Sequence, residues 1–179
     1  MKILLILLIL IINFAGTICA GEIKDRSEEI INSTFSGPVF NDAKKFMIPV
    51  ELLSEVQKKC KQKFYKNYVY YWKIEEAGSL KAIAVLDNVY GKSMPITFMV
   101  IFDLDGKIIR SEIVKYREQY GGGVSSDQWN EQFKNKNSES SFNIGSDIAA
   151  ISGATISVNS VTKGIRKLTL IFNSIKNSL

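Results

Sequence analysis

Hydroxyl-bearing and small residues gather in one short segment near the C-terminus, Ile151-Ser152-Gly153-Ala154-Thr155-Ile156-Ser157. A helix N-terminus offers free backbone N–H groups and a partial positive charge, so a helix starting here would hold a phosphate beside Thr155 without a cationic side chain. The same residue types also serve as a plain turn that caps a helix, which is their commoner use. Spacing alone leaves both interpretations open.

The residues that follow this segment predict the helix. Apolar residues recur there at spacings of three and four, which lays them along one face of an amphipathic helix: Val158, Val161, Ile165, Leu168, Phe172 and Ile175. We expect Ser157 or Asn159 to cap it.

The middle of the chain predicts an antiparallel sheet that would carry the helix. Residues 69–74, 81–89, 96–102 and 107–115 are rich in branched and aromatic residues, and Asp103-Leu104-Asp105-Gly106 is a hairpin turn signal. Residues 50–66 read as a helix holding Cys60, which we expect to be a buried structural thiol. Tyr68, Tyr70, Tyr71 and Trp72 could contact a planar cofactor, but aromatic residues of a strand more often belong to the core or the sheet surface. The expected fold is α+β, a single domain in which helices pack on the sheet.

The N-terminus has the pattern of a secretory signal peptide. Lys2 precedes an apolar run, and small residues from Gly16 to Ala20 end it, so we expect residues 1–20 to be removed after Ala20. An uncleaved membrane anchor is the competing interpretation. Residues 21–49 read as an extended lead-in or tether, with at most a short helix around residues 27–31, and residues 50–179 as the folded domain.

Composition excludes several classes of protein. The chain has no histidine and no Cys-x-x-Cys motif, which removes the usual ligands of zinc and haem and the ligand set of iron–sulfur clusters. We therefore expect no metal, and a redox role would need an organic cofactor. The formal net charge of +5 is spread along the sequence, so it is weak evidence for any partner, and we expect no nucleic acid.

The segment ending in Thr155 resembles the attachment motif of the FMN-binding domain family, which includes flavin subunits of the sodium-pumping NADH:quinone reductase and of the Rnf complex. A second segment, Tyr116-Arg117-Glu118-Gln119-Tyr120-Gly121-Gly122-Gly123-Val124, is similar to the one that precedes the motif in that family, as are Trp129 and Phe133 after it. Weaker similarity reaches back through residues 90–98.

The resemblance implies a cofactor, FMN, and a set of site residues. A dedicated flavin transferase would esterify the FMN phosphate to Thr155, while Ser152, Gly153, Ala154 and Ser157 shape the phosphate site. Contact with the flavin or its ribityl chain would come from Arg117, Glu118 and Tyr120. We accordingly expect an exported electron-transfer flavoprotein, periplasmic or tethered to the outer side of the cytoplasmic membrane. It would act with a membrane electron-transfer partner rather than as a stand-alone enzyme.

Two positions depart from the family pattern and keep a different function open. Ala149 stands where the family usually has an acidic residue, and Gly123 stands where a glutamate is common. The alternative is an exported binding or structural module of the same fold that has lost flavin. A serine hydrolase would have no histidine and would depend on a serine–lysine pair with Lys163.

Overall fold

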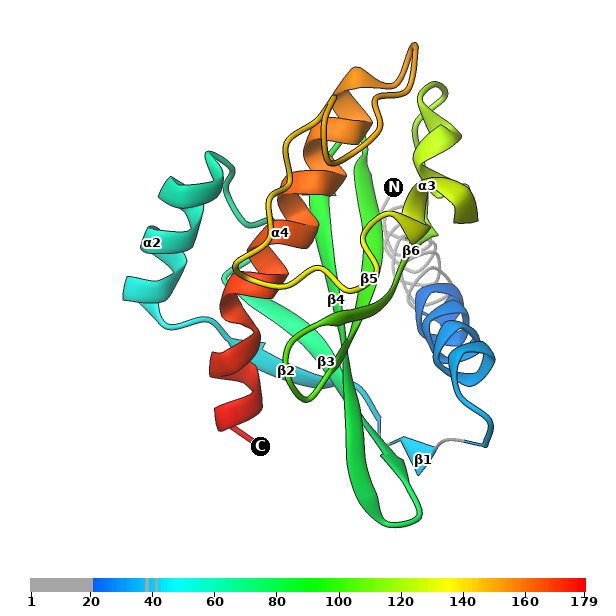
Figure 1. The fold of residues 1–179 in the computed structure, drawn as a ribbon, viewed down its shortest axis with the longest axis vertical. Coiled ribbons are helices and arrows are strands. Elements are labelled where there is room, and N and C mark those ends of the chain that lie inside the picture. The colour runs from blue at the N-terminus through cyan, green and yellow to red at the C-terminus, as the bar shows by residue number, and fades with distance from the viewer. Residues whose placement is uncertain (1–20, 38, 41) are drawn as a thin grey trace, which may run out of the picture.

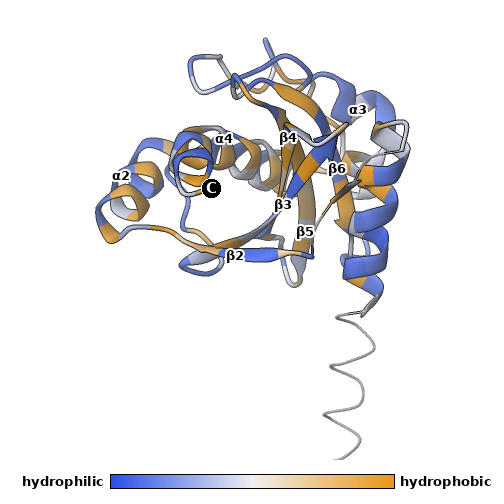
Figure 2. Ribbon diagram, turned by 90° about the horizontal axis from the view of Figure 1, so that it is seen from below, coloured by the Kyte–Doolittle hydropathy of each residue, from blue (hydrophilic) through white to orange (hydrophobic). Residues whose placement is uncertain are grey.

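An antiparallel sheet forms the centre of the protein, with helices on both of its faces (Figures 1 and 2). The computed structural model describes residues 21–37, 39–40 and 42–179. The predicted signal peptide, residues 1–20, lies outside the described residues. Among the residues described, no helix has the length and apolar character needed to cross a membrane. The predicted α+β class and the antiparallel sheet are confirmed.

Four long strands coincide with the four predicted stretches: β3 (Tyr68–Glu76), β4 (Ser79–Tyr90), β5 (Pro95–Asp103) and β6 (Ile108–Lys115). They pair in chain order, and the predicted turn at residues 103–106 joins β5 to β6. Two short strands, β1 (Val39–Phe40) and β2 (Lys44–Met47), both pair with the edge of β3 that faces away from β4. The β4–β5 turn and the β5–β6 turn lie at opposite ends of β5, so the length of one strand separates them.

Strand β4 is apolar along most of its length because both of its faces are covered. Successive side chains of a strand point to opposite faces. Ile83, Val85 and Val89 enter the core beneath the C-terminal helix. The alternate residues of β4 enter a second core on the other face of the sheet: Ala82, Ala84 and Leu86.

The C-terminal helix α4 (Thr155–Asn177) confirms the predicted amphipathic helix, since all six residues of the apolar stripe are buried. Gly164 lets α4 approach the sheet closely, because an added Cβ would lie 2.6 Å from Val89 and 2.9 Å from Phe98. The predicted cap is wrong. Ala154 occupies the N-cap without a side-chain hydrogen bond, and Asn159 donates instead to the carbonyl of Thr155 at 2.9 Å.

The extended conformation predicted for residues 21–49 is also wrong over much of its length. Residues 21–34 form a helix that covers the second core and buries Ile30 and Ile31 (Figure 2). Charged and apolar residues are mixed along this segment, because only the helix face that packs on the sheet is apolar. In the sequence such a segment resembles a polar tether. Two arginines join this helix to β6: Arg26 meets Glu112, a nearly buried carboxylate of β6, and Arg110 of β6 donates to the hydroxyls of Ser33 and Thr34.

Two shorter helices complete the fold. Helix α2 (Val50–Cys60) is shorter than predicted, since Lys61 adopts a left-handed conformation that ends it. Cys60 is buried and free, as predicted. Helix α3 (Asp127–Glu131) follows the 3₁₀ turn η1 (Gly122–Ser125), and buried Trp129 and Phe133 anchor it to the core with their rings 5.1 Å apart.

Candidate functional site

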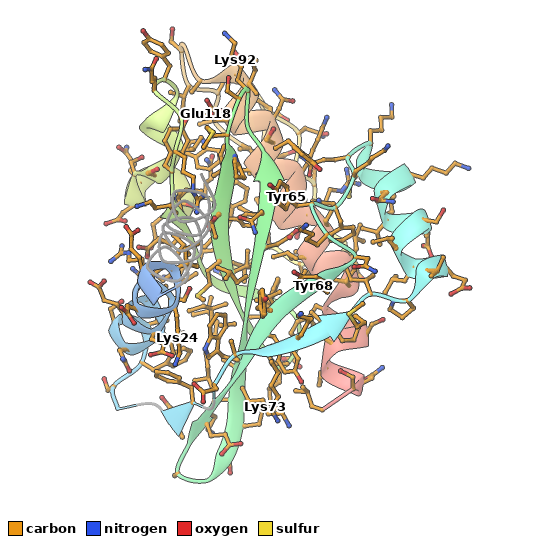
Figure 3. The ribbon with its side chains drawn as sticks, turned by 180° about the vertical axis from the view of Figure 1, so that it is seen from behind. Lys24, Tyr65, Tyr68, Lys73, Lys92 and Glu118 are labelled. Atoms are coloured by element: carbon orange, nitrogen blue, oxygen red, sulfur yellow. The ribbon has the colours of Figure 1, made fainter. Side chains whose placement is uncertain are left out.

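Three segments that are distant in the sequence line one cleft of about 770 Å³ at one end of the sheet. They are the β4–β5 turn at residues 92–94, the loop at residues 117–121 and the start of α4 at residues 153–157. Figure 3 shows Lys92 and Glu118, from the first two segments, side by side at this end of the molecule. The volume falls in the range of about 300–1,000 Å³ that is usual for small-molecule sites.

Glu118 holds the first two segments together. Its Oε1 accepts hydrogen bonds from the backbone N–H groups of Ser93 at 2.6 Å and Met94 at 3.0 Å. These bonds favour the ionised carboxylate and hold the pKa of Glu118 below its ordinary value. The carboxylate is thus engaged in fixing the turn.

Arg117 fastens the same loop to β5. Its Nη1 donates to the carbonyl of Pro95 at 3.0 Å and to Oγ1 of Thr97 at 2.9 Å. The Thr97 hydroxyl in turn donates to Asn88 of β4 at 2.7 Å. Arg117 and Glu118 therefore brace the cleft from one side, each through the β4–β5 hairpin.

Tyr116 joins the loop to α4. Its hydroxyl donates to the carbonyl of Tyr120 and also lies 2.9 Å from the Ser157 Oγ. Since a phenol has one proton, Ser157 must donate in the second bond. Gly121 passes beside this pair at φ 82°, where a Cβ would lie 2.8 Å from the Ser157 Oγ. Ser157, which is 5% exposed, thus commits its proton to the loop rather than to the cleft.

The start of α4 presents free donors to the cleft. The first helical bond runs from the N–H of Val158 to the carbonyl of Ala154, so the amides of residues 155–157 precede it and have no acceptor within the helix. No side chain caps this end, and Thr155 is exposed in the cleft lining. An anion here would meet both the free amides and the helix dipole.

Exposed apolar side chains stand around these donors. Tyr120 is 81% exposed, Ile156 48% and Met94 47%, and each comes from a different lining segment. Large exposed apolar groups that surround a concave site are typical of surfaces that a ligand covers. The cleft thus pairs an anion-binding end with apolar walls.

The structure brings together seven of the eight predicted site residues in the cleft lining: Arg117, Glu118, Tyr120, Gly153, Ala154, Thr155 and Ser157. Ser152 is exposed but lies outside the lining. Lys92, Ser93 and Met94 also line the cleft. The sequence placed them within the weaker similarity of residues 90–98 but did not predict them as site residues. It also missed the hydroxyl of Tyr116. The strand aromatics Tyr68, Tyr70, Tyr71 and Trp72 do not line this cleft.

Neither of the two departures from the expected motif, Ala149 and Gly123, is among the residues that line the cleft. Ala149 is exposed and is held through its backbone, which accepts from Trp129 Nε1 at 2.9 Å and donates to Gln132 at 2.7 Å. Nearby Asp147 accepts hydrogen bonds from Ser141 and Asn143, which lower its pKa and close its own turn. The carboxylate of Asp147 is therefore occupied by hydrogen bonds within its own turn.

Comparison with known proteins agrees with this geometry. Residues 91–169 match the model of the FMN-binding domain. The match begins in the β4–β5 turn and ends within α4, so it contains every segment that lines the cleft. A search of curated proteins found no match.

Proposed function

We propose that this chain, whose residues 91–169 form an FMN-binding domain, carries the flavin as a covalent phosphoester of Thr155 and transfers electrons outside the cytoplasm. The family match implies a flavin-binding electron-transfer protein. The observation that supports the finer proposal is the position of Thr155. Its hydroxyl-bearing side chain is exposed in the cleft, at the first residue of an uncapped 23-residue helix.

The residues of the cleft suit FMN. The free amides of residues 155–157 fit a phosphate, and the apolar side chains of Met94, Tyr120 and Ile156 suit a planar ring system. Gly121 keeps the loop close to α4, since any side chain there would collide with the Tyr116–Ser157 pair. Bound FMN supplies reversible electron uptake and release.

Attachment through Thr155 has a defined chemical balance. The Thr155 oxygen would form a bond to phosphorus and lose its proton, while the bond from phosphorus to a leaving phosphate breaks. FMN alone has no such leaving group, so the co-substrate must be an activated flavin nucleotide of the pyrophosphate class. A flavin transferase would supply this co-substrate and the base. An ester also prevents loss of the cofactor to the medium.

Export is the second part of the proposal. The charged start, apolar run and small residues of residues 1–20 support it. The exported form would be periplasmic or tethered to the outer side of the cytoplasmic membrane, near a membrane electron-transfer partner. Cell fractionation, together with N-terminal sequencing that begins at Gly21, would support it. Finding the whole pool in the cytoplasm with Met1 retained would contradict it.

Coexpression with a flavin transferase tests the attachment. The purified protein should be yellow, and its fluorescence should stay with the protein band after boiling in detergent. Thr155→Ala should lose that fluorescence, whereas Ser152→Ala, which removes an exposed hydroxyl outside the cleft lining, should keep it. A colourless wild-type protein, with an active transferase present, would favour the alternative of a module that has lost flavin.

A further inference from the structure

Charge is separated between the two faces of the sheet, although it looks evenly spread in the sequence. Residues 58–67 contain five lysines and no carboxylate, and α4 contains cations but neither aspartate nor glutamate. Both lie on one face of the sheet (Figure 1). The helix at residues 21–34 covers the other face and carries four carboxylates against two cations, Lys24 and Arg26. The α2 and α4 side thus carries a net positive charge, even though α2 also contains Glu51 and Glu55.

This cationic region reaches the cleft through specific contacts. Gln62 donates to the carbonyl of Ser160 at 3.1 Å, which holds the α2–β3 loop against the first turns of α4. The rings of Tyr65 and Tyr90 lie 4.9 Å apart and join that loop to the end of β4. Tyr90 is two residues from Lys92, which lines the cleft. Figure 3 shows Tyr65 and Lys92 at the same end of β4.

Five lysines make up this surface, which we call the cationic face: Lys61, Lys63, Lys66, Lys92 and Lys163. In the part of the chain that the structure describes, the ion pairs involve other cations, namely Lys24, Arg26, Arg110, Lys115, Lys134 and Lys167. Glu118 in the cleft lining interacts with the charge of Lys92, whereas the other four lysines of the face take part in none of these ion pairs. Most of the positive charge of the cationic face is therefore left for an external partner.

We propose that the cationic face docks an acidic electron-transfer protein and brings that protein's redox group to the cleft. This inference rests on the proposed function, because it needs an electron carrier in the cleft. The charge complementarity favours an acidic partner, and a field of one sign beside a cleft can raise association rates by about 10- to 1,000-fold at low ionic strength. A redox protein is the occupant that can also exchange electrons, which a lipid surface cannot do.

The first test needs no flavin. The flavin-free chain is titrated with poly-L-glutamate at low salt, and its backbone amides are followed by NMR. We expect the amide signals of residues 61–66, 92 and 163 to shift, and the dissociation constant to weaken about tenfold in Lys63→Glu/Lys66→Glu. The matched control, Lys81→Glu/Lys107→Glu, makes the same change in net charge at the opposite end of β4 and β5. Equal binding by the two variants would overturn the proposal.

The second test uses the FMN-loaded protein after chemical reduction. Two hexacyanoferrate(III) ions take up the two electrons held by each flavin, and the protons released go to the buffer. We expect the Lys63→Glu/Lys66→Glu variant to react about tenfold more slowly than wild type at low ionic strength, and at the same rate in about 1 M salt. With hexaammineruthenium(III), a cation, the order should reverse. The control variant should behave as wild type with both complexes.

The outcomes separate the two proposals. A protein that never acquires flavin absorbance contradicts the proposed function, whatever its affinity for poly-L-glutamate. A yellow protein whose rates are unchanged by the lysine substitutions contradicts the docking surface alone. Binding to phosphatidylglycerol vesicles in about 0.15 M salt, lost in Lys63→Glu/Lys66→Glu and without any effect on the electron-transfer rates, would also overturn it and assign the face to the membrane. Thermal unfolding of both double variants verifies that they are folded.

Discussion

Ser157 and Tyr116 share a 2.9 Å hydrogen bond that ties the first turn of α4 to the loop at residues 116–121. The two residues are 41 positions apart, so the bond connects the two motifs that the sequence singles out. Because the Tyr116 hydroxyl donates to the carbonyl of Tyr120, Ser157 must be the donor in the Ser157–Tyr116 hydrogen bond. The relative position of the two motifs thus depends on a hydroxyl in each.

Replacing Tyr116 tests this connection. Tyr116→Phe removes one hydroxyl and leaves Ser157 and the Tyr120 carbonyl without their partner, so we expect a loss of about 1–2 kcal/mol in the free energy of unfolding. The amide of Gly121 should also exchange faster with solvent. Tyr65→Phe is the control, since its ring contact with Tyr90 survives loss of the hydroxyl. Urea unfolding that is unchanged in Tyr116→Phe would show that the bond does not hold the loop.

Gly121 should be intolerant of any side chain. Its φ is 82°, and a Cβ would lie 2.8 Å from the Ser157 Oγ and 2.9 Å from the Tyr116 hydroxyl. Gly78 has nearly the same φ, 74°, with nothing within 4 Å of the added atom. Gly78→Ala should therefore cost only the backbone strain, about 1 kcal/mol, and Gly121→Ala roughly 1–3 kcal/mol more. Equal denaturation midpoints would contradict the close contact.

Glu118 gives the cleft a defined response to acid. Its pKa is held below the ordinary 4.5 by hydrogen bonds from Met94 and Ser93, so this contribution is present above pH 4.5 and is lost as the pH falls through the lower folded pKa. The amide NMR signals of Ser93 and Met94 should shift with a midpoint below 4.5. Glu118→Gln keeps an acceptor oxygen and should abolish that transition. A midpoint above 4.5 would contradict the assigned bonds.

Asp87 and Lys167 form a buried pair beneath α4, with 4.0 Å between Oδ2 and Nζ. Lys167 also donates to the carbonyl of Lys63 at 2.9 Å, whereas Oδ2 of Asp87 accepts no hydrogen bond. Burial raises the pKa of Asp87 to about 6 and lowers the pKa of Lys167. Both shifts show that the charged form of each group is disfavoured in the folded protein, because at this separation desolvation outweighs the attraction between the two groups.

The sign of the Asp87 shift gives a prediction. Between about pH 4 and pH 6 the folded protein holds a proton on Asp87 that the unfolded chain has released, so the free energy of unfolding should fall by roughly 1–3 kcal/mol as the pH rises. Carboxyl NMR of the wild-type protein should show Asp87 titrating near 6. Asp147 provides the internal comparison, since its hydrogen bonds lower its pKa below 3.8. Asp87 titrating with the same low midpoint would contradict the burial argument.

Periodic features of the sequence predicted the fold well. The apolar spacing in residues 158–175 and the four β-rich stretches are local patterns that reflect which side of an element is buried. The structure has a helix and four strands at these positions, as predicted. Features that depend on tertiary contact were missed. The helix at residues 21–34 is stabilised by a sheet face formed far away in the sequence, and the start of α4 at Thr155 depends on the preceding turn rather than on a capping side chain.

The sequence predicted where the site lies better than it predicted what each of its residues does. The two motifs, which residues 125–150 separate, do meet in one cleft, together with a turn that only the weaker similarity of residues 90–98 marked. Arg117 and Glu118 looked like ligand-binding charges, yet both bond to the β4–β5 hairpin. These bonds join residues that are more than 20 positions apart in the sequence, so no local pattern encodes them.

The covalent bond at Thr155 is tested most directly by peptide mass spectrometry of the protein purified from cells that contain the flavin transferase. Trypsin releases residues 137–163 as one peptide, because no lysine or arginine lies between Lys136 and Lys163. We predict that this peptide gains the mass of FMN less one water, and that fragmentation places the added mass on Thr155. Contradiction would come from an unmodified peptide in a yellow protein, or from added mass on Ser152 or Ser157.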